Sequence, residues 1–265
     1  MRLKNKVIIV TGSTMGIGKA IAEKAVSEGA KVIIHGLEED LGTQVVSELG
    51  DSNAKLHIED ISNAGAPQRL VELAIRSWGR LDSVVNNAAI VAASTILDTD
   101  KEFLNRILEV NTVAPCLLIQ AALPHLIENH GAVLNIGSIN AWGGEHNLLA
   151  YSISKGALMT MTRNLGDSLF REKGVRVNQI NPGWVLTENE VARKRTHGLS
   201  DDWFEKLPLV YAPAGRLIYP EEIAVAAMYW LSDECGPISG QVVDLEQYPM
   251  IGRNVPKDAN TIPHR

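Results

Sequence analysis

VIIVTGSTMGIG, residues 7–18, joins a short apolar, β-branched run to a turn that holds three glycines. An apolar run of this length that ends in glycine is typical of a strand buried on both faces of a sheet. Apolar residues then repeat at helical spacing from Gly18 to Glu28, and Gly29 follows as the residue just past a helix often does. This stretch therefore predicts a buried strand, a glycine turn and a helix, in that order.

The same alternation of strand and helix continues along the chain. Apolar runs predict further strands at residues 31–34, 55–58, 81–86, 132–136, 175–180 and 241–245. Helical spacing predicts helices at residues 39–49, 64–78, 101–129, 149–173 and 220–232. Because strands separated by such helices pair in parallel through right-handed crossovers, we predict an α/β fold with a single doubly wound, Rossmann-like parallel sheet and helices on both faces.

Two segments fall outside this rhythm. Residues 185–219 carry clustered charges and prolines, and we predict a helical insertion that forms a lid over one end of the sheet. Residues 246–265 form a tail, which either crosses a subunit interface or ends as a loose terminus. Nothing marks a linker or an internal repeat, so residues 1–265 are predicted to form one domain.

Composition excludes several classes of protein. The net charge of −6 gives no global field that favours nucleic acid or anionic lipid. The longest apolar run, Ile223 to Leu231, is nine residues long, whereas a membrane-spanning helix needs roughly 18 to 20. The apolar stretch near the N-terminus is too short for a signal peptide. Cys116 and Cys235 have no metal-ligand or disulfide spacing. We therefore expect a cytoplasmic protein that holds no metal and acts on a small molecule.

The glycine turn suggests a nucleotide. Small residues let the backbone approach a ligand, and the free N–H groups at the start of the following helix favour a pyrophosphate. The spacing of the glycines is GxxxGxG, which differs from the GxGxxG fingerprint. Taken alone, the turn indicates either a dinucleotide site or an ordinary structural loop.

Further motifs follow the turn in a fixed order. They are Asn86-Asn87-Ala88-Ala89 after the fourth strand, Asn111, Ser138 after the fifth strand, Tyr151 and Lys155 in a YxxxK pair, and Asn181-Pro182-Gly183 at the end of the sixth strand. With TGxxxGIG they make the chain, from about Val7 to Leu245, resemble the short-chain dehydrogenase/reductase family. One departure is Ala89, which stands where the family usually has the glycine of NNAG. The resemblance implies an NAD(P)-dependent oxidoreductase and usually a homotetramer, or a homodimer, with the helices at 101–129 and 149–173 in the interface.

Tyr151 and Lys155 lie four residues apart, which on a helix places them on one face. A nearby ammonium should lower the pKa of the phenol from about 10, so that Tyr151 can exchange a proton with a hydroxyl or a carbonyl. The alternative is an ordinary surface pair. The resemblance makes Tyr151 the general acid/base and has Lys155 hold the nicotinamide ribose. It also implies that Ser138 binds the reacting oxygen and that Asn111 anchors a water, although Ser138 alone suits an ordinary loop.

The end of the second strand, His35-Gly36-Leu37-Glu38-Glu39, decides between NAD and NADP. It has neither the acid that NAD-dependent members often carry at Gly36 nor the base that NADP-dependent members often carry at Leu37 or Met15. Because phosphate partners are missing, we predict NAD as the preferred cofactor, with NADP as the alternative. The resemblance places Asn86 beside the adenosine ribose. The expected cofactor-binding residues are Gly12, Ser13, Thr14, Met15, Gly16, Ile17, Gly18, Gly36, Leu37, Asp60, Ile61, Asn87, Ala88, Ala89, Tyr151, Lys155, Pro182, Gly183, Val185 and Thr187.

The loops beyond the strands suggest the substrate. The loop at 140–147 is rich in hydrogen-bonding groups and suits a hydroxylated ligand, although it reads equally well as a polar surface loop. The basic run Arg193-Lys194-Arg195, with His197, is either a solvated helix face or a pocket wall that recruits a carboxylate, phosphate or sulfonate. The candidate substrate residues are Asn140, Trp142, Glu145, His146, Trp184, Arg193 and Arg195.

These observations predict hydride transfer between a nicotinamide cofactor and a secondary alcohol, ketone or hemiacetal of a sugar, polyol or sugar acid. Two alternatives stay open. One is a 3-oxoacyl-carrier-protein-type reductase, and the other is a nucleotide-binding sensor or scaffold without turnover.

Overall fold

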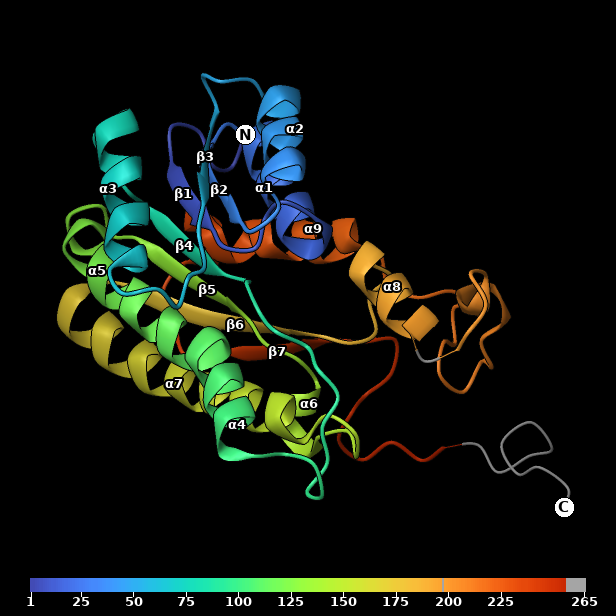
Figure 1. Cartoon of the computed structure of the whole chain (residues 1–265). Helices are drawn as coiled ribbons and strands as arrows, with labels where there is room; N and C mark the ends of the chain where they lie inside the picture. Colours follow the sequence, from blue (N-terminus) through green and yellow to red (C-terminus); the bar gives the residue numbers. More distant parts are fainter. Residues whose placement is uncertain (197, 256–265) are drawn as a thin grey trace, which may run out of the picture.

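The computed structural model describes residues 1–196 and 198–255 of the chain. Its centre is a seven-stranded parallel sheet with the strand order β3-β2-β1-β4-β5-β6-β7 (Figure 1). The strands are β1 (Val7–Val10), β2 (Lys31–Gly36), β3 (Ala54–Ile58), β4 (Ser83–Asn86), β5 (Ala132–Ile136), β6 (Arg176–Pro182) and β7 (Val242–Leu245). The predicted doubly wound α/β sheet is confirmed, and the strand order reverses between β1 and β4.

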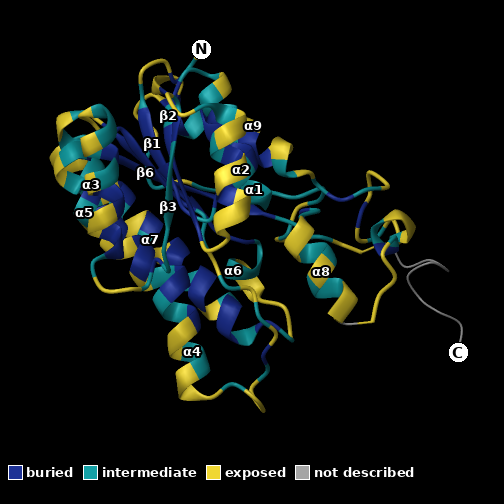
Figure 2. Cartoon of the chain, turned by 45° about the horizontal axis from the view of Figure 1, so that its top comes forward, coloured by how far each residue is buried: buried dark blue, intermediate teal, exposed yellow. Residues whose placement is uncertain are grey.

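Helices cover both faces of the sheet (Figures 1 and 2). One layer holds α1 (Gly16–Ser27), α2 (Glu39–Leu49) and α9 (Pro220–Leu231), and the other holds α3 (Ala66–Trp78), α5 (Ala114–Glu128) and α7 (Leu149–Lys173). Shorter elements lie at the carboxyl ends of the strands or in loops: α4 (Lys101–Leu108), α6 (Asn140–Gly143), α8 (Glu188–Thr196), and the 3-10 turns η2 (Trp203–Lys206) and η3 (Asp233–Cys235). The predicted strands and the long helices occur within about two residues of the expected limits, with one exception.

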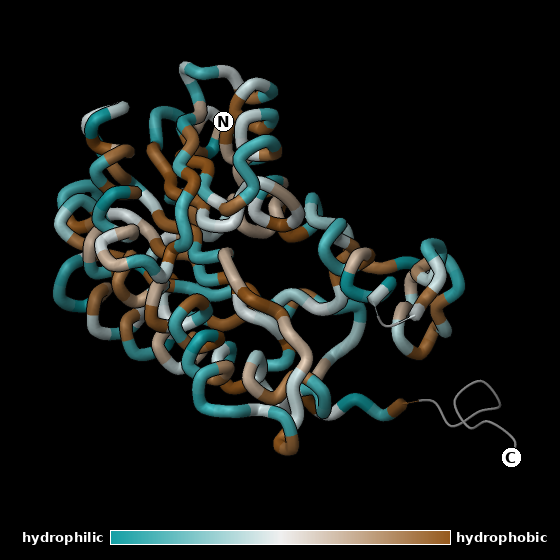
Figure 3. Tube along the Cα trace, viewed as in Figure 1, coloured by the Kyte–Doolittle hydropathy of each residue, from teal (hydrophilic) through white to brown (hydrophobic). Residues whose placement is uncertain are grey.

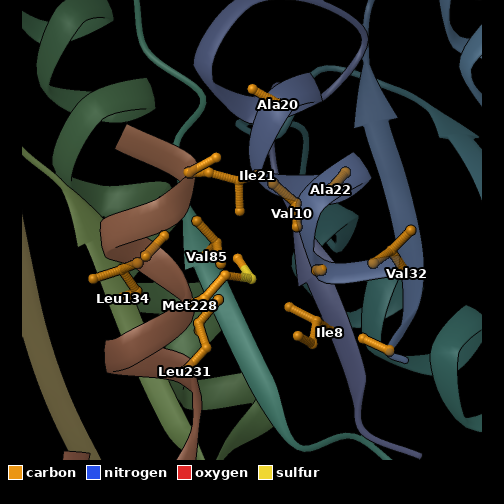
Figure 4. Close-up of a cluster of buried hydrophobic side chains, with 14 of the residues drawn as sticks. Ile8, Val10, Ala20, Ile21, Ala22, Val32, Val85, Leu134, Met228 and Leu231 are labelled. Atoms are coloured by element: carbon orange, nitrogen blue, oxygen red, sulfur yellow. The ribbon is translucent and has the colours of Figure 1, made fainter. Parts of the chain in front are cut away.

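Alternation along β1 explains the apolar run that opens the chain. Ile8 and Val10 pack into a core cluster with α1 and α9, whereas Val7 and Ile9 pack into a second cluster with α3 and α5. Figure 4 shows side chains of the first cluster, with Met228 of α9 among them. β1 and β2 are accordingly largely hydrophobic in the hydropathy view (Figure 3). A strand buried on both faces has no room for the polar alternation of an exposed sheet.

The exception is the helix predicted at 101–129. Here a π-helical turn, η1 (Glu109–Val113), separates α4 from α5. The whole run, Lys101–Glu128, is long and apolar enough to cross a membrane by length and composition. In this fold Leu118, Ala122 and Leu126 are buried in the cluster shared with α3 and the sheet, and this packing accounts for its apolar character.

The segment between β6 and α9 is less helical than predicted. Among its described residues, 183–196 and 198–219, the helical elements are α8 and η2. The segment has a small apolar cluster of its own around Trp203, Ala212 and Leu217. A bridge between Val185 and Ile218 closes its base. Two features named in the sequence predictions lie outside the described residues: His197 of the basic run, and residues 256–265 of the tail.

Candidate active site

A cavity of about 1000 Å³ opens at the carboxyl ends of the strands. Its lining includes the glycine turn after β1, the ends of β2 to β6, the start of α7 and residues of α8. It contains the point where the strand order reverses, which is where open parallel sheets generally bind ligands. The volume has room for a dinucleotide and a small substrate together.

The glycine turn is packed so closely that it excludes side chains. A Cβ atom on Gly18 would lie 2.1 Å from the carbonyl oxygen of Gly12, and a Cβ on Gly12 would lie 2.9 Å from the Cα of Ala88. Gly12 and Gly16 also have positive φ angles of 61° and 56°. These glycines hold the turn open at the start of α1, so the residues present fit the pyrophosphate of a dinucleotide.

Asn87 ties this turn to β4. Its side-chain amide donates to the carbonyl oxygens of Thr11 at 2.9 Å and Gly12 at 2.8 Å. Asn86 points the other way and donates to Asn135 Oδ1 at 2.8 Å, buried within the sheet. The expected place of Asn86 beside the adenosine ribose is therefore wrong, because successive residues of a strand point to opposite faces.

The end of β2 carries the carboxylate of Glu38, one of the two acids that follow the strand in the sequence. A Cβ on Gly36 would lie 2.5 Å from Thr14 Cγ2, so this site has no space for an acidic side chain. Glu38, two residues later, accepts a hydrogen bond from Thr14 Oγ1 at 2.8 Å, while Leu37 is exposed. His35 is buried, and burial lowers its pKa to about 4, so it is neutral and offers no charge to a phosphate.

Just beyond the end of β3, where the family resemblance implies that the adenine of a dinucleotide binds, Asp60 is held by polar contacts. Its carboxylate accepts from the backbone N–H of Ser62 at 2.9 Å and pairs with Arg106 of α4. Ile61 beside it is buried at the cavity wall. Asp60, Ile61 and Arg106 thus border the same part of the cavity.

Tyr151 and Lys155 face the middle of the cavity from α7. Burial raises the pKa of the Tyr151 phenol to about 12, and a hydrogen bond with Ser138 lowers it by a smaller amount. Burial also lowers the pKa of Lys155 to about 8, and its Nζ donates to the carbonyl oxygen of Ile136 at 2.8 Å. Burial therefore outweighs the hydrogen bond in setting the pKa of the phenol, while Lys155 Nζ lies 5.7 Å from the centre of the Tyr151 ring. The predicted effect of Lys155 on the phenol stays a prediction.

Ser138 is positioned by side chains from three other elements. Its backbone N–H donates to Asn181 Oδ1 at 3.1 Å, and Asn181 Nδ2 donates to Asp244 Oδ1 at 3.0 Å. Asp244 also accepts from Trp142 Nε1 at 2.9 Å, and the guanidinium of Arg163 lies over the Trp142 ring. Trp142 therefore braces the loop after β5 from outside, and it does not line the cavity as predicted.

Asn111 lies behind the site, in η1. Its Oδ1 accepts from the backbone N–H of Ile90 at 2.8 Å, and its Nδ2 donates to the oxygen of Ile90 and to Ser154 Oγ, both at 3.0 Å. The side chain thus connects the loop after β4 with α7. Its predicted role in anchoring a water stays a prediction.

The substrate end is organised around Trp184. Its backbone N–H donates to Glu246 Oε2 at 3.1 Å, its Nε1 donates to Glu190 Oε1 at 2.8 Å, and its ring stacks on Trp203 at 5.2 Å. Arg193 forms an ion pair with the same Glu190. Arg195 instead pairs with Asp201 on the exposed side of α8 and does not line the cavity.

Most of the remaining candidates line the cavity, and a few do not. Ser13 lies beneath the turn, where its hydroxyl donates to the oxygen of Val10 and accepts from the N–H of His35, and Gly18 packs behind it. The candidates on the cavity wall are Gly12, Thr14, Met15, Gly16, Ile17, Gly36, Leu37, Asn87, Ala88, Ala89, Asn140, Glu145, His146, Pro182, Gly183, Val185 and Thr187.

Several lining residues escaped the sequence prediction, namely Glu190, Tyr211, Glu246 and Tyr248, whereas Lys194 belongs to the basic run that was predicted as a possible pocket wall. Glu246 comes directly after the last strand, and its position at a strand end is the signal that could have found it. A Cβ on Gly183 would lie 2.0 Å from Glu246 Oε2, which shows how closely this carboxylate approaches the end of β6.

Comparison with known proteins decides the family. The family described as enoyl-(acyl carrier protein) reductase matches residues 12–246. The chain belongs to the short-chain dehydrogenase/reductase family. Like other members of this family, it is an oxidoreductase that uses a nicotinamide cofactor, NAD(P), and acts on a small molecule.

Individual relatives of this short-chain dehydrogenase/reductase differ in their substrates. It is 34% identical over 242 residues to 2-(S)-hydroxypropyl-CoM dehydrogenase 3 of Xanthobacter autotrophicus, covering 90% of this chain and 94% of that protein. It is 32% identical to the NADP-dependent (R)-specific alcohol dehydrogenase of Lentilactobacillus kefiri, with coverages of 88% and 92%. It is 30% identical to the 3-oxoacyl-(acyl-carrier-protein) reductase of Escherichia coli, with coverages of 92% and 96%. These names span several substrate classes.

Proposed function

We propose that this enzyme interconverts a secondary alcohol and a ketone on a polyhydroxylated substrate, a sugar, polyol or sugar acid, with NAD as the preferred cofactor. The observation that carries the proposal is the substrate end of the cavity, where Asn140, Glu145 and His146 line the same cavity as Tyr151. Hydrogen-bonding side chains of this kind favour the binding of a ligand that has several hydroxyl groups. A long acyl chain would leave them unpaired.

The roles of the residues follow from their positions. Hydride transfer is the chemistry that a nicotinamide cofactor supplies when bound. Tyr151 holds the proton that is exchanged with the substrate oxygen, and the raised pKa of its phenol keeps that proton on the residue in the free enzyme. Ser138 would hydrogen-bond the same oxygen, and Lys155, whose Nζ donates to the oxygen of Ile136, would hold the nicotinamide ribose.

The preference for NAD rests on charge at the end of β2. The Glu38 carboxylate lies on Thr14, where it suits a ribose hydroxyl and repels a phosphate. The lysines and arginines that line the cavity within the described residues are Arg106, Lys155, Arg193 and Lys194. Arg106, which is the one among them that borders the adenine end, already pairs with Asp60.

Cofactor and substrate are tested together. Purified enzyme is assayed by nicotinamide absorbance against neutral sugars, polyols, sugar acids, simple alcohols and ketoacyl thioesters, each with NAD and with NADP. We expect reduction of NAD by one of the polyhydroxylated classes, with the kcat/KM for NAD above that for NADP.

Two results would contradict the proposal. Oxidation of NADPH by a ketoacyl thioester, with no activity on sugars and polyols, would favour the reductase activity named for the Escherichia coli relative. Cofactor binding without turnover of any compound, at concentrations that saturate ordinary enzymes of this kind, would favour the sensor.

We also propose that the enzyme is a cytoplasmic homotetramer, or a homodimer, as the family resemblance implies. Val113 and Leu117 on η1 and α5, and Ile153 on α7, are each about two-fifths exposed, although they are apolar. Exposed apolar residues on neighbouring helices suit a subunit interface. Light scattering coupled to gel filtration tests this: a monomer at micromolar concentration would contradict it.

A further inference from the structure

The insertion presents two neighbouring basic residues to the substrate end of the cavity. Arg193 and Lys194 both line it, whereas Arg195, the next residue, does not. The Arg195 guanidinium is bound to Asp201, and 56% of its side chain is exposed. Successive residues of a helix are turned by about 100°, so α8 divides the basic run into a cavity side and a solvent side.

The charge of Arg193 is already balanced. Its Nε donates to Glu190 Oε2 at 2.9 Å and its Nη2 donates to Glu190 Oε1 at 2.8 Å, in a two-point pair. Trp184 Nε1 donates to the same carboxylate at 2.8 Å. The carboxylate of Glu190 thus accepts three hydrogen bonds and offsets the positive charge of Arg193.

Lys194, unlike Arg193, has no close carboxylate partner. Its Nζ is 3.9 Å from Glu190 Oε1, beyond hydrogen-bonding distance, and lies 4.9 Å above the Trp184 ring. Within the described residues this ammonium has no hydrogen-bond acceptor, and 18% of the side chain is exposed. The Lys194 side chain is mostly covered and lines the cavity, so an anion that enters the cavity would supply the acceptor that its ammonium lacks.

The position suits one end of a substrate whose other end reacts. Lys194 and Tyr151 line the same cavity from α8 and α7. The neighbouring Arg193 is near enough for its charge to lower the pKa of the Tyr151 phenol. The carboxylate of Glu246 accepts hydrogen bonds from the backbone N–H groups of Trp184 and Gln247.

We propose that Lys194, assisted by Arg193, binds an anionic oxygen group of the substrate, such as a carboxylate, phosphate or sulfonate, while the hydroxyl that reacts lies at Tyr151. This inference rests on the proposed function and narrows it, from polyhydroxylated compounds in general to those that carry an acid group.

Matched variants separate charge from packing. Lys194→Met keeps an apolar stem over Trp184 but removes the charge, and Lys194→Arg restores the charge. Arg195→Met removes the adjacent charge on the solvent side of α8 and is the control. D-gluconate and D-glucitol are the probes, since they differ only in a carboxylate against a hydroxymethyl group.

The first readout is turnover. We expect Lys194→Met to raise the KM for gluconate or another sugar acid about tenfold, the scale of one charge-assisted hydrogen bond, and to leave the KM for neutral polyols unchanged. Lys194→Arg restores most of the affinity, and Arg195→Met behaves as the parent enzyme. An equal effect of Lys194→Met on acidic and neutral substrates would overturn the anion site and leave the proposed function standing.

The second readout does not need turnover. The enzyme is loaded with its preferred cofactor, so that the glycine turn is filled, and is titrated with sodium sulfate and with gluconate while the tryptophan fluorescence is followed. Because Lys194 lies on Trp184, an anion bound there changes the emission. Saturable binding that is lost in Lys194→Met and kept in Arg195→Met supports the site. No saturable signal with either anion overturns it, whatever the catalytic activity proves to be.

Discussion

The two ends of the cavity are built from different materials. At the cofactor end the wall is backbone: strand ends and the start of α1, where Gly18 has no space for a single carbon atom. At the substrate end the wall is side chains of α8 and of the loop after β5, and Tyr211 is 55% exposed. The comparison teaches that cofactor binding depends on how closely the main chain packs, whereas substrate choice depends on side chains that can be exchanged one at a time.

The sharpest test of this division lies where the two ends meet. Tyr151→Phe removes the phenol proton that is exchanged with the substrate oxygen during hydride transfer, so we expect kcat to fall about a thousandfold. The dissociation constant of the cofactor should not change, because the phenol hydroxyl forms no part of the glycine turn. Steady-state kinetics and a cofactor titration measure the two effects. Turnover close to that of the parent enzyme would remove Tyr151 from its assigned role.

The next largest effect is expected at the cofactor end. Gly18→Ala places a Cβ 2.1 Å from the oxygen of Gly12, and the turn must shift to accept it. We expect the affinity for the cofactor to fall about tenfold or more and the free energy of unfolding to fall by about 1–3 kcal/mol.

Gly156→Ala is the matched control, a helical glycine whose Cβ would meet only the oxygen of Ala141, at 3.6 Å. This control should gain about 0.5–1 kcal/mol, since alanine favours the helix. Urea denaturation and cofactor titration of both variants decide the matter, and equal behaviour of the two would contradict the role of close packing.

The smallest effect is expected from the brace outside the substrate loop. Trp142→Phe keeps the ring under Arg163 but removes the N–H that donates to Asp244. Because Asp244 orients Asn181, and Asn181 orients Ser138, we expect kcat to fall by about two- to tenfold, the scale of one hydrogen bond, with KM nearly unchanged. Trp78→Phe on α3 is the control. A rise in KM alone would mean that Trp142 shapes substrate binding and does not position Ser138.

The sheet and its helices were predictable because their signals are local. A β-branched run buried on both faces, a helical repeat and a glycine that ends it all lie within a few residues of one another, as in 7–29. The π-helical turn at Glu109–Val113 was not predictable, since nothing in that sequence interrupts the helical pattern. It coincides with the bonds of Asn111 to Ile90 and Ser154, which are 21 and 43 positions away in the chain.

The candidate site divides in the same way. Residues predicted at the ends of strands line the cavity because the carboxyl ends of parallel strands all lie at the same edge of the sheet. The choice between Asn86 and Asn87 could not be made in this way, because it depends on which face of the sheet each side chain points to. In the basic run the sequence does not indicate which residue faces inward, because α8 has no buried residues to mark an inner side. The position of Trp142 was likewise not predictable, because its Nε1 donates to Asp244, which is 102 positions away in the chain.

The bridge between Val185 and Ile218 at the base of the insertion bears on how the substrate specificity of such an enzyme can evolve. Residues 185–218 begin and end at one bridge, and they enclose a cluster of their own around Trp203, separate from the two clusters of the sheet. A different sequence between the same two anchor points would therefore bring a different recognition surface, and it would leave the sheet in place if Thr187, which lies beside the glycine turn, were kept. Grafting this segment between relatives is accordingly a direct route to new substrates, and natural divergence has the same route open to it.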